Sequence, residues 1–138
     1  MWLISLRITP IVRVPANSSE WISRVLDGGA QAVIVPHVNT AAEAAHVVKC
    51  AKFAPIGERS ATNGMPQLRY QTLPFREANL VANDLTTVIC MIETEDALDN
   101  VEWVLAILIK SFTDVGSAIA EVSGLDVLLL GSADLTQE

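Results

Sequence analysis

Residues 32–53 read AVIVPHVNTAAEAAHVVKCAKF, a run of apolar residues joined to an alanine-rich segment by a short polar connection. The run 32–38 is almost entirely apolar, which is typical of a parallel strand covered on both faces. Asn39 or Thr40 can cap a helix over the alanine-rich segment that follows. Because a strand followed directly by a helix is the repeating unit of α/β proteins, this stretch predicts that fold class.

The same alternation continues on both sides of this unit. We expect further strands over 11–14, 86–93 and 125–131, each rich in apolar residues. We expect helices that begin near residues 17–19 and end at Gly28, that cover 75–85, and that begin after Thr94. Strands and helices in this order predict one sheet of parallel strands with right-handed crossovers.

Composition excludes several classes of protein. The 138 residues are 51% hydrophobic and 18% charged, which excludes a disordered chain and fits one domain with a real core. The formal charge of −7, from 9 Lys and Arg against 16 Asp and Glu, argues against a nucleic-acid partner. The apolar start of the chain is too short to span a membrane and lacks a cleavage site. Cys50 and Cys90 stand alone in apolar stretches, so we expect buried thiols in a soluble, cytoplasmic protein.

One segment breaks the alternation. The two expected strand ends Glu93 and Asp134 lie 41 positions apart, whereas Arg13 and His37 lie 24 apart. Between the former pair, residues 103–117 (WVLAILIKSFTDVGS) begin with seven apolar residues and lack the polar face of a helix that covers a sheet. We therefore interpret 103–117 as an insertion in a single partial domain that covers 1–138.

Candidate functional residues follow the expected strands. Arg13, His37, Glu93 and Asp134 each lie at the carboxyl end of one, which is where function gathers in parallel α/β proteins. Glu93 and Asp134 could hold a hard divalent cation such as Mg²⁺ or Mn²⁺, or each could cap the following helix. Arg13 could bind a carboxylate or a developing enolate oxygen, or could form an internal ion pair with an acid.

Other polar residues carry weaker signals. His37 could be a base or a metal ligand, although a hydrogen-bonded structural histidine fits the pattern better, and His46 is expected to be exposed on a helix. Asp27 lies near a helix C-terminus, which disfavours an acid, so it should have a specific partner. The stretch 54–74 is long for a connection, and its residues 57–64 have the composition of an active-site loop.

Five segments together resemble the HpcH/HpaI aldolase family. They are PIVRVP, RVLDGGAQAVIVPHVNTAAEA, PIGERSATNG, MIETEDALDNV and GLDVLLLGSADLT, in this order, and the likeness covers about residues 10–102 and 118–138. The resemblance implies a (β/α)8 TIM barrel, of which this chain would hold about four central βα units. It also implies that the protein is a metal-dependent pyruvate aldolase and that it assembles from identical subunits.

The resemblance also assigns roles to individual residues. Glu93 and Asp134 match the metal-binding carboxylates of the family. Arg13 matches an arginine that contacts the keto acid and stabilises the pyruvate enolate. Asp27 matches an acid that works with the catalytic histidine across a subunit interface. The backbone around Ser132 and Ala133 matches the segment that receives the substrate carboxylate.

The implied reaction is reversible aldol cleavage of a 4-hydroxy-2-keto acid to pyruvate and an aldehyde. The implied cofactor is Mg²⁺ or Mn²⁺, with Co²⁺ as a further option, and the implied partners are the small-molecule keto acid and aldehyde. The family's catalytic histidine precedes the VRVP segment, at a position this sequence does not reach. The alternative is therefore a catalytically inactive truncated fragment that binds metal or keto acid, or associates with full-length subunits.

Overall fold

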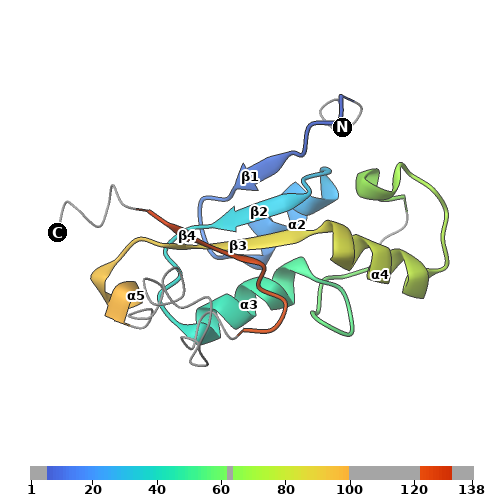
Figure 1. Cartoon of the computed structure of the whole chain (residues 1–138). Helices are drawn as coiled ribbons and strands as arrows, with labels where there is room; N and C mark the ends of the chain where they lie inside the picture. The colour runs from blue at the N-terminus through green and yellow to red at the C-terminus, as the bar shows by residue number, and fades with distance from the viewer. Residues whose placement is uncertain (1–5, 62–63, 100–121, 132–138) are drawn as a thin grey trace, which may run out of the picture.

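The computed structural model describes residues 6–61, 64–99 and 122–131 (Figure 1). These residues form one four-stranded sheet in the order β1-β2-β3-β4, and every neighbouring pair is parallel. The strands are β1 (Ile11–Arg13), β2 (Ala32–Val35), β3 (Thr87–Ile92) and β4 (Val127–Leu130). The predicted α/β class and the parallel sheet are confirmed, and strand order follows chain order, as it does in a TIM barrel.

Helices connect the strands, and two of them cover one face of the sheet. The helical segments are α2 (Ser19–Asp27), α3 (Ala41–Ala51), the 3₁₀ turn η1 (Pro66–Leu68), α4 (Phe75–Leu85) and α5 (Glu95–Asp99). In Figure 1, α2 and α3 lie side by side against the same face, and α2 packs on β2 while α3 packs on β3. We call the opposite face of the sheet the open face.

The core lies between the sheet and these two helices. Strand residues of one parity face α2 and α3 and are fully buried: Val33, Val35, Val88, Cys90 and Ile92. Because side chains alternate along a strand, residues of the other parity point to the open face, where Ile34 and Met91 stay partly exposed. The free thiols of Cys50 and Cys90 are buried, as predicted.

Two element boundaries depend on local chemistry. The helix α3 begins at the predicted cap, where Thr40 Oγ1 accepts from the Glu43 amide and the Glu43 carboxylate accepts from the Thr40 amide. The strand β2 ends at Val35 rather than at the predicted residue 38. Pro36 has no N–H for the sheet ladder, and His37 adopts a left-handed backbone conformation with φ of 52°. Both features end the strand.

Buried polar side chains hold the amino edge of the sheet, where the strands begin. Lys52 is 5% exposed, and its Nζ donates to the backbone oxygen of Asn83 at 3.0 Å and to that of Thr86. Lys52 Nζ also lies 3.2 Å from Asp126 Oδ2, and the same oxygen accepts from the Val88 amide at 2.8 Å. One lysine thus connects the starts of β3 and β4.

The predicted insertion at 103–117 lies outside the described residues. Within the three described segments, no helix is long and apolar enough to cross a membrane.

Candidate active site at the carboxyl edge of the sheet

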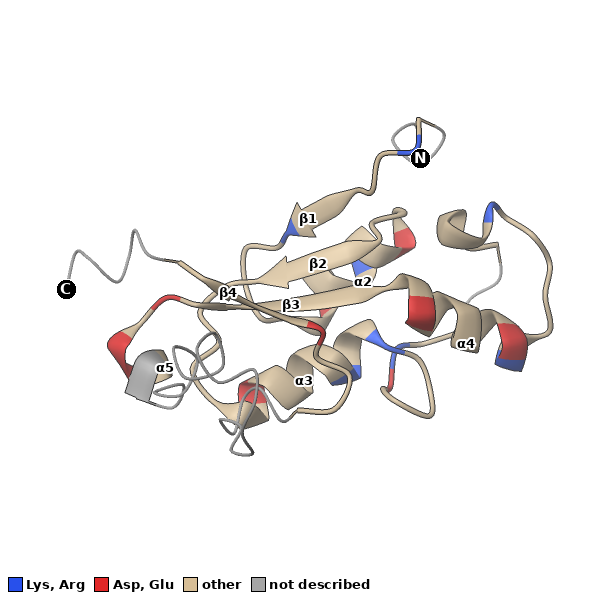
Figure 2. Ribbon diagram, viewed as in Figure 1, with Lys and Arg blue, Asp and Glu red and all other residues tan. Residues whose placement is uncertain are grey.

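Side chains from several loops meet where the parallel strands end, which we call the carboxyl edge. Arg13 is the last residue of β1, and Glu93 and Gly131 directly follow β3 and β4. Arg13 is paired with Ile34 on β2, and Ile34 is paired with Ile89 on β3, so the side chains of these three residues lie on the same face of the sheet. Side chains alternate between the two faces, and Glu93 follows Ile89 by four positions. Arg13 and Glu93 therefore both lie on the open face. Figure 2 shows the basic tip of β1 and the acidic segment between β3 and α5 at this edge.

Among the acids whose burial the structure describes, Glu93 is the most deeply buried, with 4% of its surface exposed. Its Oε2 accepts a hydrogen bond of 3.0 Å from the backbone N–H of His37 and lies 3.4 Å from His37 Nδ1. A buried carboxylate is costly unless it is hydrogen-bonded or paired with a cation. The sequence left the role of His37 open, and the structure places this residue against Glu93.

The end of β4 lies against the other side of the Glu93 carboxylate. The Gly131 amide continues the sheet by donating to the Ile92 oxygen at 2.9 Å. A Cβ on Gly131 would lie 2.5 Å from Glu93 Cγ and 3.0 Å from Glu93 Oε1. Only a residue without a side chain lets the carboxylate occupy this position.

Arg13 extends from the end of β1 into an exposed environment. Within the described segments it forms no ion pair, and the carboxylate of Glu93 contacts His37 instead. The alternative of an internal pair between Arg13 and a described acid therefore has no support. An exposed guanidinium on the open face remains available to an anionic ligand.

Asp27 lies at the other edge of the sheet. Because α2 runs antiparallel to the strands, its last residue returns to the amino edge, away from Glu93 within one chain. The predicted specific partner is Arg59, whose Nη2 donates to Asp27 Oδ1 at 2.6 Å. The Arg59 guanidinium also lies over the Phe53 ring, 4.5 Å from its centroid.

The predicted active-site loop also lies at the amino edge in its described part. Within the loop, the Arg59 amide donates to the Lys52 oxygen at 3.0 Å and the Arg59 side chain donates to Asp27. Just after the loop, Gln67 Nε2 donates to the backbone oxygens of Leu26 and Ala30. The reason is topological, since α3 carries the chain back to the amino edge before the loop begins. The expectation is therefore corrected for a site formed within one chain.

A metal ion at the carboxyl edge would find one described ligand. The Glu93 carboxylate is a hard oxygen donor of the kind that Mg²⁺ and Mn²⁺ prefer, and its Oε1 lies beside Gly131. The structure groups no three His, Cys, Asp or Glu side chains into a metal site among the described residues. Ser132, Ala133 and Asp134 lie outside the described residues.

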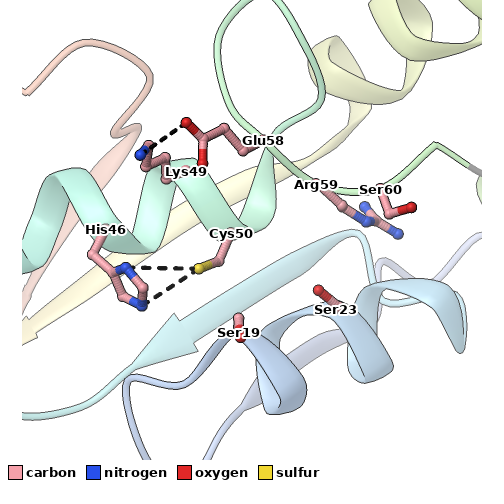
Figure 3. Close-up of a pocket in the computed structure, with 8 residues that line it drawn as sticks. All are labelled: Ser19, Ser23, His46, Lys49, Cys50, Glu58, Arg59 and Ser60. Atoms are coloured by element: carbon pink, nitrogen blue, oxygen red, sulfur yellow. Dashed lines mark hydrogen bonds and ion pairs between the residues drawn. The ribbon is translucent and has the colours of Figure 1, made fainter.

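A separate pocket of about 340 Å³ lies on the helical side of the sheet, between α2, α3 and the segment after α3 (Figure 3). It contains neither Arg13 nor Glu93. His46 is exposed, as expected, and its Nε2 lies 3.5 Å from Cys50 Sγ. Burial raises the pKa of the Cys50 thiol above its ordinary value. Of the predicted site residues that the structure describes, Arg13 and Glu93 thus lie at the carboxyl edge and outside this pocket.

Comparisons with known proteins show the family. The family model described as HpcH/HpaI aldolase/citrate lyase matches residues 3–138. The chain belongs to this family. It is 35% identical over 133 residues to a 4-hydroxy-4-methyl-2-oxoglutarate aldolase of Chaetomium globosum, covering 95% of this chain and 44% of that protein. It is 40% identical over 125 residues to a 4-hydroxy-2-oxovalerate aldolase of Novosphingobium aromaticivorans, covering 91% and 41%.

Solved structures give the same result for the fold. An HpcH/HpaI aldolase from Desulfitobacterium hafniense superposes with a TM-score of 0.78 at 23% identity, over 98% of this chain and 48% of that one. A family member from Burkholderia cenocepacia gives a TM-score of 0.75 at 28% identity, over 98% and 48%. The chain spans less than half the length of these relatives, and its sheet is part of a TIM-barrel-like fold.

Proposed function

We propose that this protein acts in the metal-dependent, reversible aldol cleavage of a 4-hydroxy-2-oxo acid to pyruvate and an aldehyde or ketone. The observation that carries the proposal is the buried Glu93 carboxylate at the carboxyl edge, held against His37 and Gly131 on the open face. A buried acid at this place in a parallel sheet is characteristic of a functional site. Family membership and the names of the relatives support the reaction class.

The proposal gives each residue a task. Glu93 and Asp134 hold a divalent cation. Arg13 binds an oxygen of the keto acid, and the backbone around Ser132 and Ala133 receives the substrate carboxylate. When bound, the cation supplies Lewis-acid stabilisation of the negative charge that develops on the substrate.

The aldol cleavage needs no reactant other than the keto acid and a base. A base takes the proton from the 4-hydroxyl group, the C3–C4 bond breaks, and C4 becomes the carbonyl carbon of the released aldehyde or ketone. The electron pair of the broken bond forms the enolate of pyruvate, whose oxygen Arg13 stabilises with a fixed positive charge. Protonation at C3 then gives pyruvate.

Asp27 is proposed to act in the site of a neighbouring copy of the chain. Its place at the amino edge, away from Glu93 in the same chain, supports a role across a subunit interface. The proposed assembly is therefore a homo-oligomer. The proposed compartment is the cytoplasm, because the buried Cys50 and Cys90 are free thiols, as suits a reducing environment.

The first experiment measures exchange of the pyruvate methyl protons for deuterium by NMR, with purified protein and Mg²⁺ in D₂O. Enolisation is common to all substrates of this reaction, so no aldehyde has to be chosen. We expect exchange above the rate of Mg²⁺ alone, which EDTA stops. Glu93→Gln should abolish it, whereas Glu77→Gln, a change of an exposed glutamate on α4, should not. A folded protein without exchange would contradict the proposal.

A second measurement tests the cation site without catalysis. Electron paramagnetic resonance reports the free fraction of Mn²⁺ during a titration with protein. We expect Glu93→Gln to weaken binding by at least about tenfold, because a coordinating charge is lost. Equal affinities for wild type and Glu93→Gln would place any bound ion elsewhere.

A further inference from the structure

His37 occupies a fixed position in the loop after β2. Its backbone is left-handed, with φ of 52°, a conformation that is uncommon for residues with a side chain. The next residue, Val38, donates its amide to the Met91 oxygen of β3 at 3.1 Å. This bond ties the loop to the end of β3 and sets the distance between His37 and Glu93.

Two groups of His37 approach the same carboxylate oxygen. The backbone N–H donates to Glu93 Oε2 at 3.0 Å, and the ring Nδ1 lies 3.4 Å from that oxygen. The left-handed backbone makes this possible, since it turns the amide and the ring of one residue toward one point. The histidine side chain is 58% exposed, so packing alone does not explain its position.

The two carboxylate oxygens of Glu93 have different surroundings. Oε2 is occupied by His37, while Oε1 lies beside Gly131 at the end of β4. A glutamate has three side-chain torsions, and a ligand whose second oxygen is held loses much of that freedom before an ion arrives. The contact therefore leaves Oε1 as the oxygen that His37 does not hold.

We propose that the imidazole of His37 is a positioning group that, beside the backbone amide of the same residue, fixes the Glu93 carboxylate through Oε2 and so presents Oε1 to the divalent cation. This inference rests on the proposed function, because it takes Glu93 as a metal ligand. Groups that orient a metal ligand in other proteins change metal affinity by about 10- to 100-fold when they are removed. An effect of this size is expected here.

The test uses two substitutions that suit the left-handed backbone. His37→Gly keeps the amide and the favourable φ but removes the ring, and His37→Asn keeps φ and supplies a short side-chain N–H donor. Tyr70→Gly is the matched control, since Tyr70 also has a positive φ, 59°, and an exposed side chain, but lies in the loop before α4. The three variants separate loss of the imidazole from the effect of a new glycine.

The first readout is the Mn²⁺ dissociation constant. We expect His37→Gly to raise it about 10- to 100-fold, His37→Asn to restore it to within about threefold of wild type, and Tyr70→Gly to leave it unchanged. Unchanged affinity in His37→Gly would overturn the positioning role. Equal Mn²⁺ affinities of His37→Asn and His37→Gly would also overturn it, because the loss of affinity would then not depend on a side-chain N–H donor beside Glu93.

The second readout needs no metal. The side-chain carboxyl ¹³C resonance of Glu93, recorded at constant pH on the metal-free protein, should shift or broaden in His37→Gly and not in Tyr70→Gly. An unaltered resonance overturns the inference whatever the metal does. If the resonance shifts but the wild-type protein binds no Mn²⁺, the contact between His37 and Glu93 stands and the proposed function is refuted. Failure of the inference and failure of the proposed function are therefore distinguishable.

Discussion

Gly131 allows the buried carboxylate of Glu93 to lie against the end of β4. A methyl group at Gly131 would approach Glu93 Cγ to 2.5 Å and Oε1 to 3.0 Å, closer than real side chains come. A backbone position on one strand therefore determines where the carboxylate on the next strand can be. The candidate site therefore depends on the glycine at position 131 as well as on Glu93.

Gly131→Ala should displace Glu93 and weaken Mn²⁺ binding by at least about tenfold, since an error of 1 Å in a ligand is costly. The overpacking should also lower the free energy of unfolding by about 1–3 kcal/mol. Mn²⁺ titration and urea denaturation measure the two effects. Gly28→Ala is the control, because its Cβ would meet backbone oxygens at 3.3 and 3.4 Å, outside the site. Wild-type affinity in Gly131→Ala would contradict the prediction.

Lys52→Met should lower the free energy of unfolding by about 2–4 kcal/mol, because two backbone oxygens and Asp126 lose a buried, charged donor. Urea denaturation followed by circular dichroism measures the change. Lys49→Met removes a lysine near the end of the same helix whose only pair, with Glu58, is exposed, and should leave stability close to wild type. Similar midpoints for both variants would show that the Lys52 hydrogen bonds contribute little.

Asp27→Ala should lower the free energy of unfolding by about 2 kcal/mol, because the Arg59 side chain is only 2% exposed and would lose its acceptor. Asp27→Asn should recover about half of that loss, since an amide oxygen still accepts from Arg59. Thermal or urea unfolding gives both values. Equal stability of Asp27→Ala and wild type would make the ion pair irrelevant to folding and would leave the subunit-interface role as the reason for Asp27.

Cys90 should make stability fall at high pH. Burial raises the pKa of its thiol to about 12, whereas an exposed thiol titrates near about 8.5. The unfolded chain therefore ionises first, so the stabilisation is complete below about pH 8.5 and is lost as pH rises toward 12, at about 1.4 kcal/mol per unit. Urea denaturation under reducing conditions measures the free energy of unfolding at pH 9 and at pH 10. Between these two values it should fall by about 1 kcal/mol less in Cys90→Ala than in wild type. An equal fall in both proteins would refute the raised pKa of Cys90.

The helices and strands could be predicted because each depends on neighbouring residues. The apolar run before Pro36, the capping box of Thr40 and Glu43, and the helix over 75–85 carry their own signals. The parallel sheet followed from the alternation of strands and helices. The end of β2 was placed three residues too late, since apolar character continues to Val38 although the ladder stops at Pro36.

The candidate site could be predicted in part. Arg13 and Glu93 were found because a residue at a strand end is visible in the sequence. The contact of Glu93 with His37 was not, since a left-handed turn at a histidine has no reliable sequence signal. The place of residues 64–68 at the amino edge could not be seen either, because loop composition does not say which edge of a sheet a loop reaches.

Local periodicity in the sequence was enough to indicate the α/β class, the parallel strands, and an arginine and a glutamate at the carboxyl ends of two of them. Only the tertiary structure decided that His37 and Gly131 enclose the Glu93 carboxylate and that Asp27 pairs with Arg59 at the opposite edge. These contacts join residues 32 to 56 positions apart. Their geometry depends on how strands and loops pack in space, which no local pattern records.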